Sequence, residues 1–220
     1  MDDSLRLETV EKTVLFVKKE LSGAEGGHDW EHTYRVWRNA CSIAKEEEAD
    51  LFVVELGALL HDIADPKFHD GDENIGPEKA GGFLRSLALD DDIIEKVKAI
   101  VLHVSFKGGN YKSGYNSREL DVVRDADRLD AIGAIGIARA FNYGGFKNRS
   151  MYDPEMPPRL NMGPKEYRAN TGPTINHFYE KLLRLKDMMN TNTGKRMAEE
   201  RHRFMEGFVE RFIDEWEGRK

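Results

Sequence analysis

A short apolar stretch that ends in a histidine and an aspartate constrains the fold of this chain more than any other feature. Apolar side chains dominate residues 51–60, and His61 and Asp62 follow them directly. A helix that places these apolar side chains in a core carries an imidazole and a carboxylate to its buried end, where both are costly unless a partner compensates them. A bound cation is the simplest partner, so the sequence predicts a metal site at the end of this helix.

The other ligands of such an ion must come from different segments of the chain. Two consecutive helical residues point about 100° apart, so His61 and Asp62 can flank one ion only near a helix end. His32 and Asp127, which lie in other helical patterns, are the candidates. Because the four residues must converge on one ion, we expect one domain over residues 1–220 rather than two small ones.

The types of ligand limit the choice of metal. Two imidazoles and two carboxylates offer a mixed set of nitrogen and oxygen atoms, which suits transition metals better than calcium. We expect one divalent transition metal ion, with manganese as the first expectation and nickel, cobalt, iron or zinc as alternatives. Magnesium is a further alternative.

Structural alternatives exist for these residues. His61 and Asp62 could form the C-terminal cap of a helix with a solvated aspartate. Asp125, Asp127 and Asp130 could line one exposed acidic face. Asp125 and Asp127 lie about 200° apart around a helix, so both cannot face one ion.

A pair of histidines near residue 30 raises a different metal chemistry. His28 and His32 are four residues apart, the spacing that binds zinc in H-E-x-x-H proteases. Asp29 stands where those proteases carry glutamate, and glycines precede His28. We therefore reject a protease site and expect Asp29 to cap a helix whose first turn turns His32 inward.

The ordered set of His32, the His61-Asp62 pair and Asp127 resembles the H…HD…D signature of the HD superfamily of metal-dependent phosphohydrolases. The surrounding segments HDWEHTYRV, ELGALLHDIAD and VRDADRLDAIGAIGIARAF are similar as well. The later segments NYGGFKNRSMYDP and HFYEKLLRLKDMMNT resemble one branch of that superfamily, the bacterial YpgQ-like nucleoside triphosphate pyrophosphohydrolases. The resemblance selects Asp127 as the fourth ligand and implies an HD-domain helical bundle with the metal site between helices.

This resemblance implies an enzyme that hydrolyses phosphoester or phosphoanhydride bonds with metal-activated water. The expected reaction converts a nucleoside or deoxynucleoside triphosphate to the monophosphate and pyrophosphate. The alternatives are a 5′-nucleotidase or other phosphomonoesterase, an alarmone hydrolase, and a metal-dependent nucleotide-sensing module without turnover. In each case the partner is a small phosphorylated molecule.

Further residues are candidates for catalysis and substrate binding. Asp65 lies one helical turn after His61 and could take a proton from water, or could cap the helix before Pro66. His103 could contact a phosphate, or could be a histidine at the edge of the core. Four cations are candidates for contacts with a polyphosphate, although most such side chains are simply surface residues: Lys67, Lys107, Arg128 and Lys181.

The rest of the chain shows helical patterns. Periodic apolar residues predict an N-terminal helix over 4–21, an HD core from about 25 to 143 with one long helix from 117 to 143, and C-terminal helices within 174–217, at about 174–190 and 194–217. The segment 144–173 is rich in proline and too long for an ordinary connector, so we expect an ordered lid over the site. No convincing strand pattern is present, and the predicted fold class is all-α.

Composition adds limits on partners and location. The chain has 220 residues, of which 40% are hydrophobic and 33% charged, as in ordinary globular proteins. A net charge of −7 disfavours nucleic-acid binding. The sequence shows neither a long apolar stretch nor the pattern of a signal peptide, so we expect no association with a membrane. The single cysteine, Cys41, favours a reducing compartment. We expect a cytoplasmic monomer or homodimer.

Overall fold

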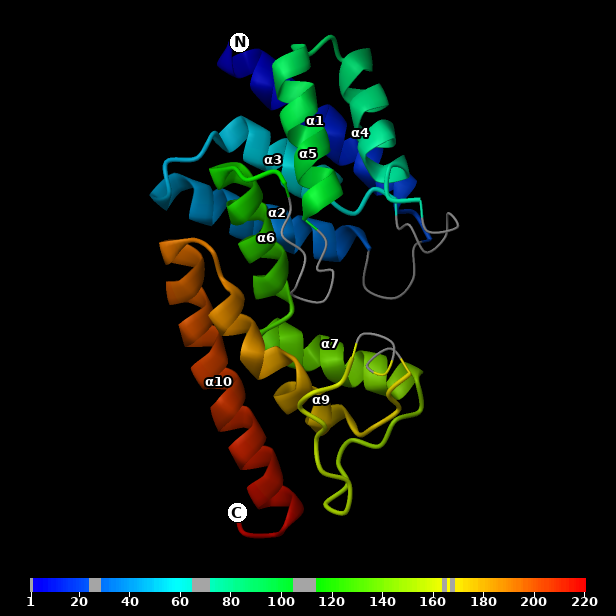
Figure 1. The fold of residues 1–220 in the computed structure, drawn as a ribbon, viewed down its shortest axis with the longest axis vertical. Coiled ribbons are helices and arrows are strands. Elements are labelled where there is room, and N and C mark those ends of the chain that lie inside the picture. Colours follow the sequence, from blue (N-terminus) through cyan, green and yellow to red (C-terminus); the bar gives the residue numbers. More distant parts are fainter. Residues whose placement is uncertain (1, 24–28, 65–71, 105–113, 164–165, 167–168) are drawn as a thin grey trace. The chain divides into compact units, whose positions relative to one another are not determined.

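A computed structural model describes residues 2–23, 29–64, 72–104, 114–163, 166 and 169–220. The described residues form helices and connecting segments and contain no strand (Figure 1). The prediction of an all-α fold is therefore confirmed. The chain divides into two compact units, residues 1–127 and 128–220. The single HD-type domain over residues 1–220 stays a prediction.

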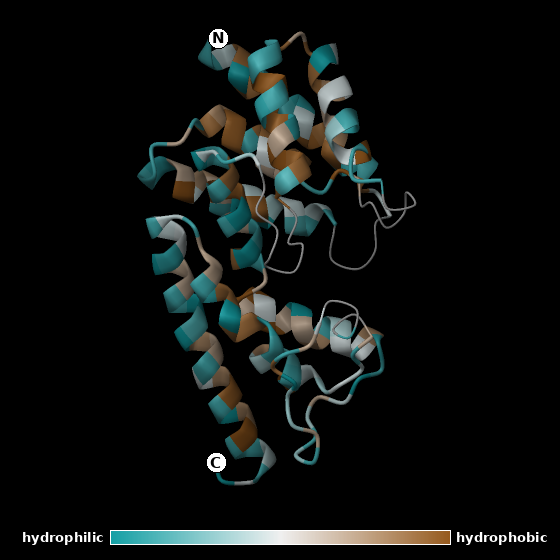
Figure 2. Ribbon diagram, in the orientation of Figure 1, coloured by the Kyte–Doolittle hydropathy of each residue, from teal (hydrophilic) through white to brown (hydrophobic). Residues whose placement is uncertain are grey.

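Five helices and most of a sixth make up the described part of the first unit: α1 (Asp3–Glu20), α2 (Trp30–Glu46), α3 (Leu51–Leu60), α4 (Ile75–Ser86), α5 (Asp91–His103) and α6 (Arg118–Asp130), whose residues up to Asp127 belong here. Helix α3 is the centre of this unit, since it packs against α1, α2 and α5. Its side chains are mainly apolar (Figure 2) and are almost all buried. The apolar stretch before His61 thus forms a core helix, as the sequence predicts.

Close packing of α3 against α5 depends on a glycine. A Cβ atom at Gly57 would lie 3.0 Å from both Cδ1 and Cγ2 of Ile100. Ile100 is fully buried, and its β-branched side chain has little freedom to move. The absence of a side chain at residue 57 therefore allows these two helices to approach.

The described part of the second unit contains α7 (Gly133–Phe146), α9 (Thr174–Glu180), the 3₁₀ helix η2 (Leu182–Met188) and α10 (Asn192–Trp216). Helix α10 packs against α7 and η2. Aromatic rings from these elements and from the preceding segment contact one another, with centroids 5.5 to 6.3 Å apart; they are Phe141, Tyr152, Phe178, Phe208, Phe212 and Trp216. Phe178 is fully buried and Trp216 is 47% exposed, so the cluster runs from the core of the unit to its surface.

The predicted long helix from 117 to 143 is wrong, because the structure interrupts it. Helix α6 ends at Asp130, and Ile132 has an extended backbone with φ −128° and ψ 168°. Gly133 then adopts φ +75°, a conformation that favours glycine. Its missing side chain also leaves room for Arg201, whose Cγ would lie 3.0 Å from a Cβ there. Residues 174–190 are likewise divided, into α9 and η2.

Polar contacts hold several described residues of the proline-containing segment 144–173. Asn170 Nδ2 donates to Glu180 Oε2 at 2.8 Å, and the backbone N–H of Arg159 donates to Glu180 Oε1 at 3.1 Å. Arg149 donates to the carbonyl oxygen of Asn170 at 2.6 Å. Glu180 and Asn170 are both buried. The role of this segment as a lid stays a prediction.

Across the described residues, no helix is both long and apolar enough to span a membrane.

Candidate metal centre

His32 lies in the first turn of α2, where a cap fixes the start of the helix. Asp29 Oδ1 accepts a hydrogen bond from the backbone N–H of His32 at 2.8 Å. Such a cap satisfies one of the N–H groups that have no partner within the helix. The His32 residue is 3% exposed. The predicted cap and the inward direction of His32 are both confirmed.

His61 and Asp62 lie directly after α3. Asp50 starts this helix by accepting hydrogen bonds from the N–H groups of Phe52 and Val53. The apolar face of α3 then carries the chain through the core, so that His61 is 4% exposed and Asp62 has a side chain that is 20% exposed. The buried end predicted from the apolar stretch is therefore present.

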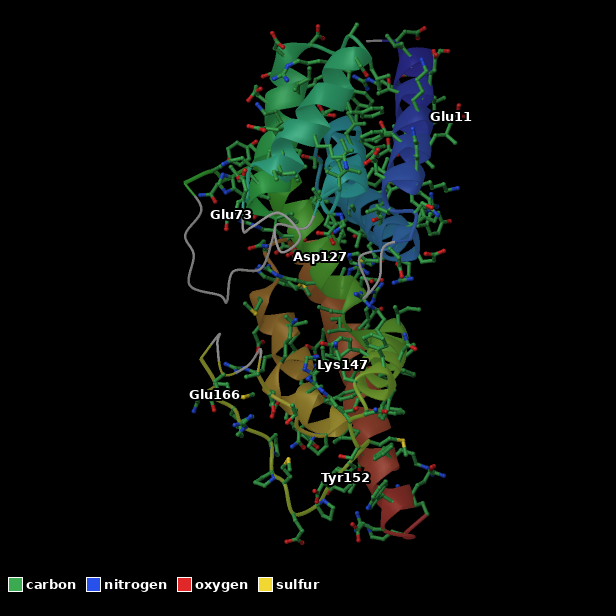
Figure 3. All side chains as sticks on the ribbon, turned by 90° about the vertical axis from the view of Figure 1, so that its right-hand side faces the viewer. Glu11, Glu73, Asp127, Lys147, Tyr152 and Glu166 are labelled. Atoms are coloured by element: carbon green, nitrogen blue, oxygen red, sulfur yellow. The ribbon has the colours of Figure 1, made fainter. Side chains whose placement is uncertain are left out.

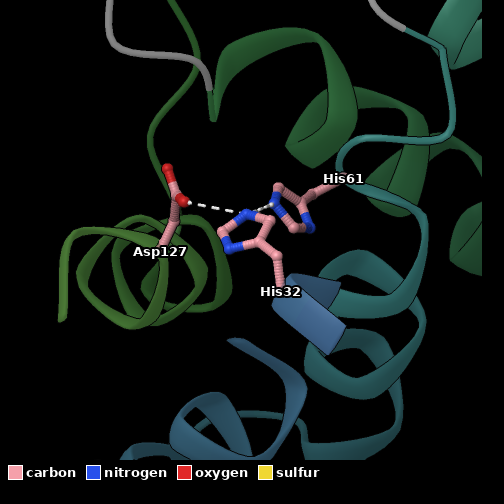
Figure 4. Close-up of side chains that lie close together, drawn as sticks. All are labelled: His32, His61 and Asp127. Atoms are coloured by element: carbon pink, nitrogen blue, oxygen red, sulfur yellow. Dashed lines mark hydrogen bonds and ion pairs between the residues drawn. The ribbon is translucent and has the colours of Figure 1, made fainter. Parts of the chain in front are cut away.

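Four side chains converge at this point. His32 Nε2 lies 3.3 Å from His61 Nε2, 3.5 Å from Asp62 Oδ2 and 3.5 Å from Asp127 Oδ1. His61 Nε2 lies 3.4 Å from Asp62 Oδ2. Figure 4 shows His32, His61 and Asp127 turned toward one another, and Figure 3 places Asp127 on α6. Their ligand atoms all lie within 4.8 Å of one another.

The donor set fits a divalent ion. Ligand atoms around a transition metal at about 2.0–2.2 Å are separated by roughly 3.0–3.6 Å in tetrahedral or octahedral geometry, and the measured separations of 3.3 to 3.5 Å fall in that range. Two carboxylates also balance the charge of one divalent cation. These residues could hold such an ion without a large rearrangement.

A backbone carbonyl orients the ring of His61 for this role. His61 Nδ1 lies 2.8 Å from the carbonyl oxygen of Ala58. Because a carbonyl can only accept, Nδ1 donates to it, and this contact turns Nε2 toward His32 and the carboxylates. This arrangement is usual for a histidine that binds a metal.

The electrostatics of the site favour a positive charge. Burial lowers the pKa of His61, but the charge and hydrogen bond of Asp62, followed by the charge of Asp127, outweigh burial and raise this pKa to about 9. The buried imidazole of His61 therefore lies in a negative potential, which would equally stabilise a metal cation.

Other acidic residues of α6 do not form an exposed face. Asp125 is 0% exposed and Asp130 is 1% exposed, and Asp130 forms an ion pair with Arg139. The alternative that residues 125, 127 and 130 line a solvated acidic surface is therefore wrong.

The remaining predicted site residues are placed differently. His103 ends α5, is half-buried, and stacks on Tyr115 with ring centroids 6.0 Å apart. Arg128 and Lys181 belong to the second unit. Arg128 donates to the carbonyl oxygen of Met188, and Lys181 lies between α9 and η2. Three further candidates lie outside the described residues: Asp65, Lys67 and Lys107.

The sequence did not single out Arg124 or Tyr115 beside these elements. Arg124 lies one turn before Asp127 and donates two hydrogen bonds to the carbonyl oxygen of His103. The only sequence signal for Arg124 is its place three residues before Asp127 in the segment VRDADRLD. However, an arginine on a helix is usually a surface residue, and the backbone partner carries no sequence signal.

Comparisons with known proteins identify the family of this chain. The HD domain family matches residues 29–132, which include all four converging residues. The Bacillus subtilis protein YpgQ is 39% identical over 204 residues, or 92% of this chain and 91% of YpgQ. A crystal structure of an HD-superfamily hydrolase from Bacillus thuringiensis matches with a TM-score of 0.79 and 44% identity, covering 96% of this chain and 98% of that one. A crystal structure of Bacillus subtilis YpgQ in complex with ADP matches with a TM-score of 0.75 and 34% identity, covering 96% of each chain.

The chain therefore belongs to the HD superfamily, and within it to the YpgQ-like proteins. Membership of this superfamily makes it a metal-dependent phosphohydrolase. HD domains bind divalent metals, and the group of His32, His61 and Asp127 could hold one here.

Proposed function

We propose that this protein is a nucleoside triphosphate pyrophosphohydrolase with one divalent ion, manganese first, held by His32, His61, Asp62 and Asp127. The observation that carries the proposal is that His32 Nε2 lies 3.3 to 3.5 Å from ligand atoms of His61, Asp62 and Asp127, and that His61 Nε2 lies 3.4 Å from Asp62 Oδ2. Support for a nucleotide comes from the related YpgQ, which was crystallised in complex with ADP.

In the proposed reaction, water attacks the α-phosphorus of a nucleoside triphosphate, the bond to the bridging oxygen breaks, and pyrophosphate leaves. A bound divalent ion supplies Lewis acidity and lowers the pKa of water toward neutrality. Asp65 accepts the proton of the attacking water. The carbonyl oxygen of Ala58 accepts from Nδ1 of His61 and so orients the ring such that Nε2 would bind the ion.

Cations bind the polyphosphate in this proposal. His103 and Lys107 contact oxygens on which negative charge accumulates during attack, and Lys67 is a further contact for the polyphosphate. Arg128 and Lys181 belong to the second unit and stay candidates from the sequence. Fixed positive groups stabilise such charge without reorganisation.

The test is a product assay with metal-stripped protein. Nucleoside triphosphates, nucleoside monophosphates and an alarmone are incubated with manganese, cobalt, nickel, iron, zinc or magnesium, and pyrophosphate and phosphate are measured separately. Asp62→Ala removes one proposed ligand. Asp92→Ala removes an exposed carboxylate that pairs with Lys96 and serves as the control.

We expect pyrophosphate from triphosphates with manganese, loss of product in Asp62→Ala, and unchanged turnover in Asp92→Ala. Phosphate released from monophosphates would instead assign a nucleotidase, and pyrophosphate released only from the alarmone would assign an alarmone hydrolase. Tight nucleotide binding without product under every metal would assign a sensing module.

A further inference from the structure

Two arginines of α6 donate hydrogen bonds to backbone carbonyls at the C-terminal ends of other helices of the first unit. They lie at different distances from Asp127 along α6. In the first turn, Arg118 Nη1 donates to the carbonyl oxygen of Glu47 at 2.6 Å. Two turns later, Arg124 Nε and Nη2 both donate to the carbonyl oxygen of His103, at 3.1 and 2.8 Å. The second contact is a two-point contact from a side chain that is only 16% exposed.

The acceptor of the Arg124 contact is a group that needs a partner. The last four carbonyls of a helix have no intrahelical N–H to accept from, and His103 is the last residue of α5. A guanidinium at this end also meets the negative pole of the helix dipole. The rigid fork of arginine fixes direction as well as distance, so Arg124 locks the end of α5 to one turn of α6.

That turn of α6 is the one that carries the proposed metal ligand. Arg124 and Asp127 are three residues apart, which places them one turn from each other and about 60° apart around the helix. Asp127 is the most exposed of the four converging groups, with 31% of its side chain accessible against 3% for His32 and 2% for His61. Its place at the site therefore depends strongly on the position of its helix.

We propose that Arg124 is a positioning residue that places Asp127 for the metal and holds the end of α5, where His103 lies. Through α6, the fork sets the distance of the Asp127 carboxylate from His32. Through the His103 carbonyl, the guanidinium of Arg124 also fixes the last turn of α5. The imidazole of His103 in this turn stacks on Tyr115. This inference rests on the metal site of the proposed function.

The test measures Mn²⁺ affinity of the full-length, metal-stripped protein by calorimetry. Arg124→Gln removes the fork, and Arg124→Lys keeps the charge but offers a single point of contact. Arg118→Gln is the matched control, since it removes an arginine-to-carbonyl bond from the same helix, far from Asp127. Far-UV circular dichroism and urea unfolding of each variant show how much stability each change costs.

We expect Arg124→Gln to bind Mn²⁺ about 10-fold more weakly, the low end of the losses seen when a group bonded to a metal ligand is removed, because Arg124 acts on Asp127 through the helix. Arg124→Lys should lie between Arg124→Gln and the wild type, and Arg118→Gln should keep wild-type affinity. If Arg124→Gln does not fold, Arg124→Lys decides, and wild-type affinity in that variant overturns the proposal.

Two other results would also overturn it. Wild-type affinity in folded Arg124→Gln would show that Asp127 needs no such anchor. An equal loss in Arg118→Gln would show that only general stability of α6 matters. Absence of Mn²⁺ binding by the wild type would overturn the metal site itself, so the two failures are distinguishable.

Discussion

Two histidines of this protein experience opposite electric fields. Asp62 and Asp127 raise the pKa of His61 to about 9 against the effect of burial. His177 has its pKa lowered to about 4, first by burial and then by the charges of Lys181 and Arg149. One imidazole is thus placed to meet a cation, and the other is held neutral.

The lowered pKa of His177 predicts a loss of stability in mild acid. An unfolded chain would protonate this histidine near pH 6.5, whereas the folded protein resists protonation until about pH 4. Its contribution is therefore complete above pH 6.5 and is lost as the pH falls toward 4. Between pH 7 and 4.5, we expect the free energy of unfolding to fall by up to about 2 kcal/mol more in the wild type than in His177→Asn.

Urea unfolding of both proteins at the two pH values measures this difference. A proton NMR titration of the His177 ring checks the cause. A midpoint near 6.5 in the folded protein, or equal acid sensitivity in the variant, would contradict the prediction.

At the scale of helices, two aspartate caps should affect stability equally but the metal site differently. Asp29 caps α2 directly at His32, whereas Asp50 caps α3 at its start, a whole helix before His61. We expect Asp29→Ala and Asp50→Ala each to lower the free energy of unfolding by about 1 kcal/mol. Only Asp29→Ala should also weaken Mn²⁺ binding, because the first turn of α2 carries the ligand.

Urea unfolding and metal titration of the two variants test this prediction. Equal metal affinity in both variants would mean that packing, rather than the cap, fixes His32.

The contact between α3 and α5 predicts the effect of a single methyl group. Gly57→Ala improves helix propensity by about 1 kcal/mol, but its Cβ would lie 3.0 Å from two carbon atoms of buried Ile100. Since overpacking costs about 1–3 kcal/mol, we expect a net loss of about 1 kcal/mol. Ile100→Val removes Cδ1, so Gly57→Ala should cost less in that background. A double-mutant cycle by urea unfolding measures the coupling, and additive effects would show that the helices simply move apart.

At the scale of the whole molecule, all four proposed ligands lie within residues 1–127. A ligand that binds only the folded state adds to the free energy of unfolding, by about 2.7 kcal/mol at a hundred times its Kd. We expect Mn²⁺ to raise the unfolding temperature and EDTA to reverse the effect. Hydrogen exchange should slow mainly in α2, the end of α3 and α6. Protection confined to α10 would place the ion elsewhere.

Much of the fold and of the proposed site was predictable from the sequence. Helical periodicity and the apolar stretch before His61 predicted the all-α class and the core helix α3, and Asp29 predicted the start of α2. The convergence of His32 and Asp127 with His61 and Asp62 followed from the cost of burying unpaired polar groups and from the family resemblance. Periodicity and caps depend only on residues close together in the sequence, and the ligand set matches a motif of a known family.

The breaks between helices and the supporting contacts were not predictable. The break at Gly133 inside the predicted helix 117–143 had no local signal, because its positive φ depends on the turn at Ile132 and on Arg201, which lies far along the chain. Arg124 gave no signal, since its partner is a backbone carbonyl. Tertiary contacts decide both features, and a single sequence does not display them.

The spread of the proposed ligands along the chain has a kinetic consequence. His61 and Asp62 are adjacent, but His32 lies roughly 30 residues before them and Asp127 roughly 65 residues after them, so an unfolded chain pays loop entropy before it can present all four. An ion would meet its full set of ligands only in the native state. Binding should therefore slow unfolding and leave the refolding rate almost unchanged. In a cell, the loaded protein would persist because it opens rarely, and not because it folds quickly.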